Sequence, residues 1–258
     1  MGKVICIANQ KGGVGKTTTA VNLAASLALS SKSTLLIDID PQGNASSGVG
    51  MAKNGFEKNI YHVIIEEVDI SQVIRETGYD NLSIVTSSID LIGAEIELVN
   101  FPERESRLKE RLSTIIDEYD YIIIDCPPSL GLLTVNAFNA SDSVLIPIQC
   151  EYYALEGLTQ LLNTVKRIKR AFNPNLRIEG FLLTMFDKRN NLSHQVASEI
   201  KNFFPEKVLQ TIIPRNVRLG ECPSHGKPIF YYDKLSAGAR SYLELAQLIA
   251  NGEAKTNG

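Results

Sequence analysis

The sequence predicts an α/β fold in which helices flank a doubly wound, mostly parallel sheet. Short apolar, β-branched runs recur along the chain and alternate with segments of helical periodicity, which is the order expected for parallel strands joined by crossover helices. Hydrophobicity is continuous within each run, as is typical of strands buried on both faces. A glycine-rich turn joins the first run to the first helical segment, and such a connection suits the binding of an anion at a helix N-terminus.

The predicted elements follow one another in a single domain that spans residues 1–251. Strands are predicted at 4–8, 34–39, 82–86, 121–125, 143–148, 178–184 and 208–213. Helices are predicted at 16–28, 103–117, 129–139, 156–171, 192–204 and 237–251. Because no repeat, low-complexity linker or change of composition divides the chain, we expect one core, followed by a disordered tail at residues 252–258.

Composition limits the classes of protein to consider. The 258 residues include 29 acidic and 26 basic side chains, for a net charge of -3, so the chain lacks the positive charge of a dedicated nucleic-acid-binding protein. Four widely spaced cysteines without C-x-x-C spacing indicate neither a disulfide framework nor a zinc site. The sequence shows no signal peptide and no apolar run of about 18 residues. We therefore expect a cytoplasmic protein.

The glycine-rich turn at residues 11–18 carries the strongest chemical signal. In such a loop the backbone amides surround phosphates, the lysine at position 16 reaches the outer phosphates, and the Thr17 hydroxyl ligates Mg²⁺. The usual pattern has glycine six residues before that lysine; here the position holds Gln10, and a second lysine, Lys11, opens the loop. We expect a site for ATP and Mg²⁺, against the alternative of a fortuitous glycine-rich turn.

Three carboxylates are expected close to this loop, at the ends of two strands. Asp38 and Asp40 lie at the end of the second predicted strand, and Asp125 ends the fourth. Open α/β sheets bind ligands at the carboxyl ends of their strands, where a carboxylate can hold the water shell of Mg²⁺ or orient an attacking water. The alternatives are that Asp38 or Asp40 caps the following turn and that Asp125 is only a strand end.

Together these motifs resemble the deviant-Walker P-loop NTPases and, more narrowly, the chromosomal ParA/Soj partition ATPases. The resemblance rests on the loop at 11–18, on the segments 38–44 and 125–129, and on three further segments at 152–158, 213–218 and 223–228. It covers the chain from the first residue to about Asn251.

The resemblance implies a mechanism in which ATP lies between two protomers. Lys11 would reach the phosphates of the partner protomer, Lys16 would hold those of its own, and Asp40 would orient the hydrolytic water; these are the implied catalytic residues. Thr17, Asp38 and Asp125 would lie at the metal. The implied nucleotide-binding set is Lys11, Gly12, Gly13, Val14, Gly15, Lys16, Thr17, Thr18, Pro214, Arg215 and Asn216. Slow intrinsic hydrolysis is expected, since only the dimer completes the site.

The resemblance also implies partners. These are a homodimer formed on ATP, a ParB-type protein that stimulates hydrolysis, and double-stranded DNA bound through its phosphates without sequence specificity, so the protein would be nucleoid-associated. The implied DNA contacts are Lys188, Arg189 and Arg218. The sequence adds basic residues near the end of a predicted helix, for which the alternative is a solvated cluster that interacts with the helix dipole: Lys166, Arg167, Lys169 and Arg170.

Three rival functions use the same loop chemistry. A Min-type membrane ATPase needs a basic amphipathic C-terminal helix, but residues 242–255 show no Lys/Arg face, so we expect no membrane partner. An iron–sulfur electron carrier would use cysteines, yet Cys126 and Cys150 lie in strand-like runs and do not suggest a cluster. A cargo-positioning relative that uses the same cycle on the nucleoid stays open, because the partner protein selects the cargo.

Overall fold

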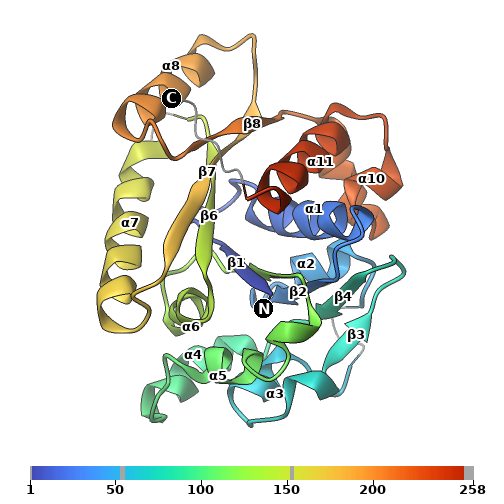
Figure 1. Cartoon of the computed structure of the whole chain (residues 1–258), viewed down its shortest axis with the longest axis vertical. Helices are drawn as coiled ribbons and strands as arrows, with labels where there is room; N and C mark the ends of the chain where they lie inside the picture. The colour runs from blue at the N-terminus through green and yellow to red at the C-terminus, as the bar shows by residue number, and fades with distance from the viewer. Residues whose placement is uncertain (1, 53–55, 152–153, 253–258) are drawn as a thin grey trace.

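The computed structural model describes residues 2–52, 56–151 and 154–252 (Figure 1). Most of the predicted tail, from residue 253, and residues 152 and 153 of one family-like segment lie outside the described residues. Among the described helices, none combines the length and the hydropathy required to cross a bilayer.

A single eight-stranded sheet forms the centre of the described chain, in the order β3-β4-β2-β5-β1-β6-β7-β8. All neighbouring strands are parallel except β3 and β4, which pair antiparallel. The predicted doubly wound, mostly parallel sheet is therefore confirmed. The strands are β1 (Lys3–Ile7), β2 (Thr34–Asp38), β3 (Ile74–Glu76), β4 (Leu82–Val85), β5 (Tyr121–Asp125), β6 (Ser143–Gln149), β7 (Arg177–Phe186) and β8 (Val208–Pro214).

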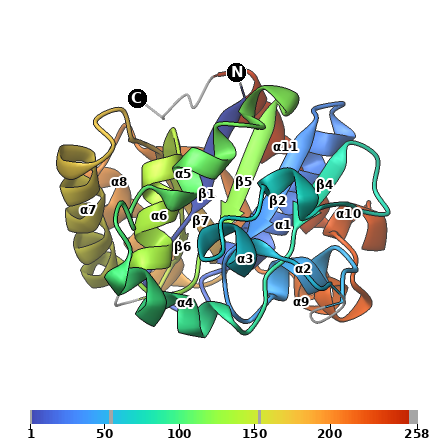
Figure 2. The same cartoon turned by 90° about the horizontal axis from the view of Figure 1, so that it is seen from below.

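Helices cover both faces of this sheet (Figures 1 and 2). The α-helices are α1 (Lys16–Leu29), α2 (Asn44–Gly48), α3 (Ile60–Ile64), α4 (Leu91–Glu97), α5 (Arg107–Leu112), α6 (Leu132–Ala140), α7 (Ala154–Ala171), α8 (Asn191–Phe203), α9 (Val217–Glu221), α10 (Ile229–Tyr232) and α11 (Ala237–Ala250). Short 3₁₀ turns lie at η1 (Ile70–Gln72), η2 (Leu98–Asn100), η3 (Ile116–Glu118) and η4 (Cys222–His225).

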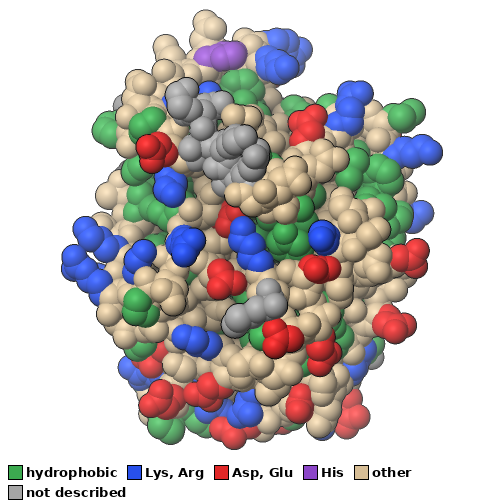
Figure 3. Space-filling view, viewed as in Figure 1, with side chains coloured by type: hydrophobic (Ala, Val, Ile, Leu, Met, Phe, Trp, Pro, Cys, Tyr) green, Lys and Arg blue, Asp and Glu red, His purple; other side chains and the backbone are tan. Residues whose placement is uncertain are grey.

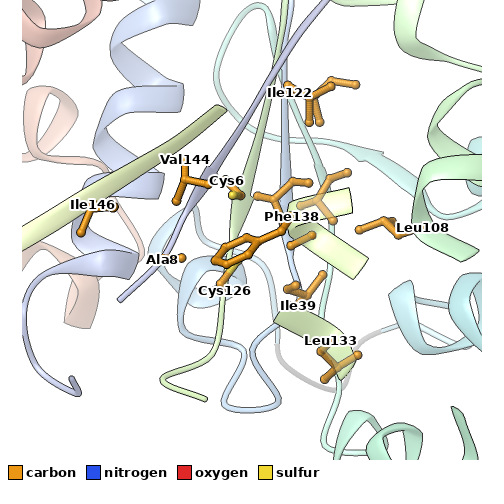
Figure 4. Packing of buried hydrophobic residues seen from close by; sticks show 14 of the residues in the cluster. Cys6, Ala8, Ile39, Leu108, Ile122, Cys126, Leu133, Phe138, Val144 and Ile146 are labelled. Atoms are coloured by element: carbon orange, nitrogen blue, oxygen red, sulfur yellow. The ribbon is translucent and has the colours of Figure 1, made fainter. Parts of the chain in front are cut away.

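The alternation of side chains along β1 divides the core into two layers. Cys6 belongs to the layer that also contains Phe138 of α6 and Leu161 of α7, and Figure 4 shows part of this packing. Ile5 belongs to the layer beneath α1 and α11, which contains Tyr242. Because both faces of the strand are buried, its sequence is apolar at every position after the first, as the sequence predicts.

Several elements differ from the sequence predictions. The short helices α2, α3, α4, α9 and α10 were not predicted. The three-residue edge strand β3 was not predicted, since a run so short gives no periodic signal. The helix predicted at 103–117 is reduced to α5, because the hydroxyls of Ser113 and Thr114 donate to the carbonyls of Glu110 and Arg111 at its end and such bonds compete with helix continuation. The helix predicted from 129 begins only at Leu132.

Candidate nucleotide site

The phosphate loop connects β1 to α1 through two glycines with positive φ, Gly13 at 73° and Gly15 at 89°. Gly15 is the N-cap of α1, and it has no side chain to occupy the first amides of the helix. The Thr184 hydroxyl of β7 donates to the Val14 carbonyl at 2.8 Å and so fixes the loop to the sheet. A Cβ built on Gly12 or Gly13 meets no atom within 4 Å. The loop therefore presents free amides to open space, as anion binding requires.

Lys16 lies within the loop that it is predicted to serve. Its side chain is buried, and its Nζ donates to the Lys11 carbonyl at 2.9 Å. Burial lowers the pKa of the Lys16 ammonium, while the charges of Asp125 and Asp40 raise it. The two carboxylates thus favour the charged form of the lysine, which is the form that binds phosphate.

Lys11 points elsewhere. Its backbone N–H donates to Asn9 Oδ1 at 3.0 Å, and its ammonium forms an ion pair with Glu151 at 2.5 Å, just beyond the end of β6. Both side chains of the pair are partly exposed, at 36% and 46%. The two lysines of the loop therefore differ in position: Lys16 faces the loop, and Lys11 is held by a carboxylate of its own chain.

Asp38 and Asp125 are register partners on the adjacent strands β2 and β5, and both are fully buried. Asp38 accepts from the Ser46 amide and hydroxyl, both at 2.8 Å, and from the Asp40 amide at 3.2 Å. Burial raises the pKa of Asp38 to about 6 in spite of these bonds. Asp38 thus anchors α2, a role closer to the turn-capping alternative than to direct contact with a metal.

Asp125 has no such support. Both of its carboxylate oxygens are buried without a hydrogen-bond partner among the described residues. Burial and then the Asp38 charge raise its pKa well above the usual range, whereas the proximity of the Thr17 hydroxyl, a potential hydrogen-bond donor, and the Lys16 charge lower it. A buried carboxylate without a donor is costly unless a cation compensates it. The residues therefore fit Mg²⁺, with Thr17 and Asp125 as the protein groups that would hold it.

The described residues contain no group of three His, Cys, Asp or Glu side chains that could hold a metal ion by themselves. A magnesium ion would accordingly take its remaining ligands from water and from phosphate oxygens, as is usual for Mg²⁺ at nucleotide sites. All four cysteines are buried and unpaired, in agreement with the sequence prediction that they form no disulfide framework.

Asp40 caps a turn and also lines the cavity beside the phosphate loop. Its Oδ1 accepts from the Gln42 amide at 2.9 Å, which is a turn cap. The residue nevertheless lines the cavity beside the phosphate loop. Its carbonyl accepts from the Ser87 hydroxyl at 2.5 Å, so the segment after β4 fixes the segment after β2.

A cavity of about 540 Å³ joins the predicted site residues. Its wall contains the phosphate loop on one side and the segment after β8 on the other, so the predicted adenine border at Pro214, Arg215 and Asn216 faces the same space as the loop. The wall also contains residues that were not predicted from the sequence as part of the site: Pro128, Thr184, Met185, Leu219 and Tyr242. Met185, with a positive φ of 49°, had no sequence signal.

The implied DNA contacts lie outside this cavity and are exposed. The Arg189 guanidinium, 92% exposed, donates to both oxygens of Asp187 at 3.2 and 3.3 Å. Arg218 pairs with Glu221 at 2.9 Å and with Asp233 at 3.5 Å. Lys188 is exposed beside Arg189. Lys and Arg side chains also gather over α7 at one edge of the molecule (Figure 3), where Lys166, Arg167, Lys169 and Arg170 are exposed.

The fold and site define a P-loop nucleotide-binding protein: a strand, a glycine-rich loop and a helix at the carboxyl edge of a parallel sheet. Comparison with known proteins narrows this class. A family model described as "AAA domain" matches residues 2–178. The Soj protein of Bacillus subtilis, named a sporulation initiation inhibitor, is 58% identical over 253 residues, which cover 98% of this chain and 100% of Soj. The chromosome partitioning protein ParA of Myxococcus xanthus is 56% identical, covering 96% of this chain and 87% of ParA.

The chain belongs to the ParA/Soj family of chromosome-partitioning P-loop ATPases. A solved structure with the same fold is that of cobyrinic acid a,c-diamide synthase from Mycobacterium smegmatis with bound ADP and magnesium. It is 33% identical, has a TM-score of 0.88, and the match covers 100% of this chain and 98% of that one. ATP and Mg²⁺, predicted from the loop, are the cofactors that this fold and site accommodate.

Proposed function

We propose that this protein is a ParA-type partition ATPase that forms a dimer around ATP, binds duplex DNA without sequence specificity, and leaves DNA when a ParB-type partner stimulates hydrolysis. The observation that carries the proposal is the position of Lys11. This lysine opens the phosphate loop but does not line the cavity, and it pairs with Glu151 near the molecular surface. A loop lysine placed in this way is available to a second protomer's nucleotide once the ion pair opens.

The site residues divide the work of hydrolysis among them. Lys16 and the loop amides bind and orient the outer phosphates. Thr17 and Asp125 hold Mg²⁺, which when bound neutralises charge on the phosphate oxygens. Asp40 lines the cavity with a carboxylate that orients the attacking water. Lys11 of the second protomer adds positive charge where the transferred phosphoryl group becomes more negative, so hydrolysis is slow until two protomers meet.

DNA binding is assigned to the exposed basic residues Lys188, Arg189 and Arg218. Contacts from such residues to phosphates give affinity without sequence preference. Their effect is multiplied when dimerisation on ATP places two copies on one surface. Nucleoid association in the cytoplasm follows from this binding.

The experiment that tests the proposal measures binding to a random-sequence duplex by fluorescence anisotropy, with ATP, with ADP and without nucleotide. We expect wild type to bind DNA with ATP but not with ADP or without nucleotide. Asp40→Ala should stay bound longer, and Arg189→Glu should lose binding. Lys109→Glu, a charge reversal at an exposed position of α5, is the matched control and should bind as wild type does. Arg167→Glu decides whether the α7 cluster belongs to the DNA surface or is merely solvated.

Nucleotide-independent binding, or no binding in any state while ATP still drives dimerisation, would contradict the DNA assignment. The cargo-positioning alternative shares the DNA step and differs in the partner that stimulates hydrolysis. A membrane function is not proposed, because the apolar face of α11 is occupied: Tyr242, Leu245, Ala246 and Ile249 are buried in the core.

A further inference from the structure

Helix α6 begins seven residues after Asp125 and has no cap of its own. Its N-cap is Gly131, which offers no side chain, and its first turn contains no acidic residue. Glu95 of α4 supplies the missing acceptor: its Oε2 accepts from the Leu132 amide at 2.8 Å and its Oε1 from the Leu133 amide at 3.3 Å. Figure 2 shows α4 beside α6. The helix that follows the Asp125 loop is therefore capped from another element.

The fit between this carboxylate and the start of α6 is close. A Cβ added to Gly131 would lie about 2.5 Å from Glu95 Oε2, too close for a carbon and an oxygen that are not bonded, so the Glu95 carboxylate would have to move away. The approach of Glu95 therefore favours glycine at position 131, whereas the Gly131 φ of -79° suits any residue. Two positions distant in the sequence are matched to each other here.

Helix α4 is also connected to the second carboxylate loop of the site. It begins four residues after Ser87, whose hydroxyl donates to the Asp40 carbonyl and whose amide donates to Ser46 Oγ at 3.2 Å. The α4 segment therefore contacts the loop after β2 at one end and, through Glu95, the loop after β5. The second of these loops includes Pro128, which lines the nucleotide cavity.

We propose that Glu95 is a positioning residue for ATP hydrolysis: by capping α6 from α4 it fixes the loop that follows Asp125 and so, together with the pairing of β5 to β1 and β2, the place of the Asp125 carboxylate at the metal. This inference rests on the proposed ATPase function. A displaced loop moves the carboxylate relative to Mg²⁺, and displacements of about 1 Å at a reacting centre cost up to about a hundredfold in rate.

The test compares Glu95→Ala, Glu95→Gln and Gly131→Ala in the full-length protein. Glu97→Gln is the matched control, because Glu97 lies on the same helix and accepts from the Tyr61 hydroxyl instead. We expect Glu95→Ala to lower kcat about tenfold, to leave KM for ATP nearly unchanged, and to raise the Mg²⁺ concentration needed for half-maximal activity. Glu95→Gln, which keeps one acceptor oxygen, should fall between, and Gly131→Ala should repeat the Glu95→Ala result.

Amide hydrogen exchange of the nucleotide-free protein gives a second readout. Exchange at Leu132 and Leu133 should accelerate in Glu95→Ala and stay as in wild type in Glu97→Gln. Accelerated exchange with wild-type kcat and Mg²⁺ dependence would overturn the inference, because Glu95 would then be only a structural cap. If Glu95→Ala does not fold, Glu95→Gln and Gly131→Ala decide by the same criteria.

Failure of the proposed function is distinguishable from failure of this inference. If wild type hydrolyses no ATP, the proposed function is wrong, and the Mg²⁺ dependence of binding to a fluorescent ADP analogue then tests Glu95 alone. The inference requires that Glu95→Ala needs a higher Mg²⁺ concentration than wild type for half-maximal binding of the analogue. An unchanged concentration in that assay would reject it.

Discussion

The nucleotide site and the basic surface of this protein are built in opposite ways. In the site, Lys16, Asp38 and Asp125 are buried, and the backbone or the neighbouring strand fixes each of them. On the surface, Arg189 and Arg218 are exposed and paired with acids of their own segments. Buried groups have one arrangement and large individual effects, whereas exposed ion pairs exchange partners at little cost. The site is thus defined by its geometry, and the surface by its charge.

The largest effect is expected for Lys16→Ala. The substitution removes the only cavity-facing ammonium of the phosphate loop, and a lost charge contact at the transferred phosphoryl group costs about a thousandfold in kcat. ATP hydrolysis and nucleotide-dependent DNA binding should both disappear, while Lys109→Ala on α5 should leave both intact. The measurement is steady-state phosphate release with each variant. Retention of more than a tenth of the activity would mean that the buried lysine does not carry the phosphate contact.

Asp125→Asn should have the next largest effect. It should stabilise the nucleotide-free protein and impair Mg²⁺-dependent hydrolysis of ATP. Without nucleotide, a buried carboxylate that lacks a donor destabilises the fold, so the amide should raise the free energy of unfolding by about 1–3 kcal/mol at pH 8. With nucleotide, the loss of a metal-facing charge should raise the Mg²⁺ concentration required for half-maximal hydrolysis. Urea unfolding and a Mg²⁺ titration measure the two quantities, and a less stable empty variant at pH 8 would contradict the account.

The pH dependence of the same unfolding experiment tests whether the buried carboxylates cause this instability. Burial raises the pKa of Asp38 to about 6 and that of Asp125 well above its usual range. The folded state therefore binds more protons than the unfolded state above about pH 4, where free aspartates ionise. The contribution of these two carboxyl groups to the free energy of unfolding of the nucleotide-free protein should be greatest below about pH 4. It should fall as the pH rises through about 6. Asp125→Asn should flatten that fall.

Asp187→Asn tests the surface half of the comparison. The Arg189 hydrogen bonds lower the pKa of the Asp187 carboxyl, so at neutral pH the pair is fully charged and competes with DNA phosphate for the guanidinium. Removing the charge at position 187 should tighten ATP-dependent DNA binding about twofold, the scale of one exposed ion pair. Arg189→Ala should weaken binding and lower the salt slope of the affinity by about one. Weaker binding by Asp187→Asn would mean that the pair presents the arginine to DNA and does not withhold it.

The difference between the two regions also explains what the sequence predicted. The positions of the strands along the chain follow from runs such as Tyr121–Asp125, because strands buried on both faces are largely apolar. The loop at 11–18 could also be predicted, since its glycines and lysines form a pattern within one short segment. The edge strand β3 was missed because three residues give no period. The length of α5 was overestimated because hydroxyl-to-carbonyl bonds at Ser113 and Thr114 end the helix.

Within the site, the sequence predicted residue types better than it predicted their partners. Asp125 was expected at the metal, but its lack of any donor is a property of packing among the described residues. Glu95 and Met185 gave no signal, because one acts through α6 and the other lines the cavity with an unusual backbone conformation. Contacts between segments far apart in the chain are set by the fold as a whole, and no local pattern announces them.

An effect of similarly small size is expected for Glu151→Gln, at the boundary between the two regions. The Lys11–Glu151 pair is partly exposed, so opening it costs only about 0.2–1 kcal/mol, or up to about fivefold in an equilibrium. If Lys11 must leave Glu151 to reach a partner's phosphates, the amide should strengthen ATP-dependent dimerisation by that factor, measured by sedimentation at several protein concentrations. Glu179→Gln, which breaks the Lys3–Glu179 pair at 2.7 Å near the start of β7, is the matched control and should leave dimerisation unchanged. Weaker dimerisation by Glu151→Gln would show that Glu151 itself belongs to the interface and supports the contact between protomers.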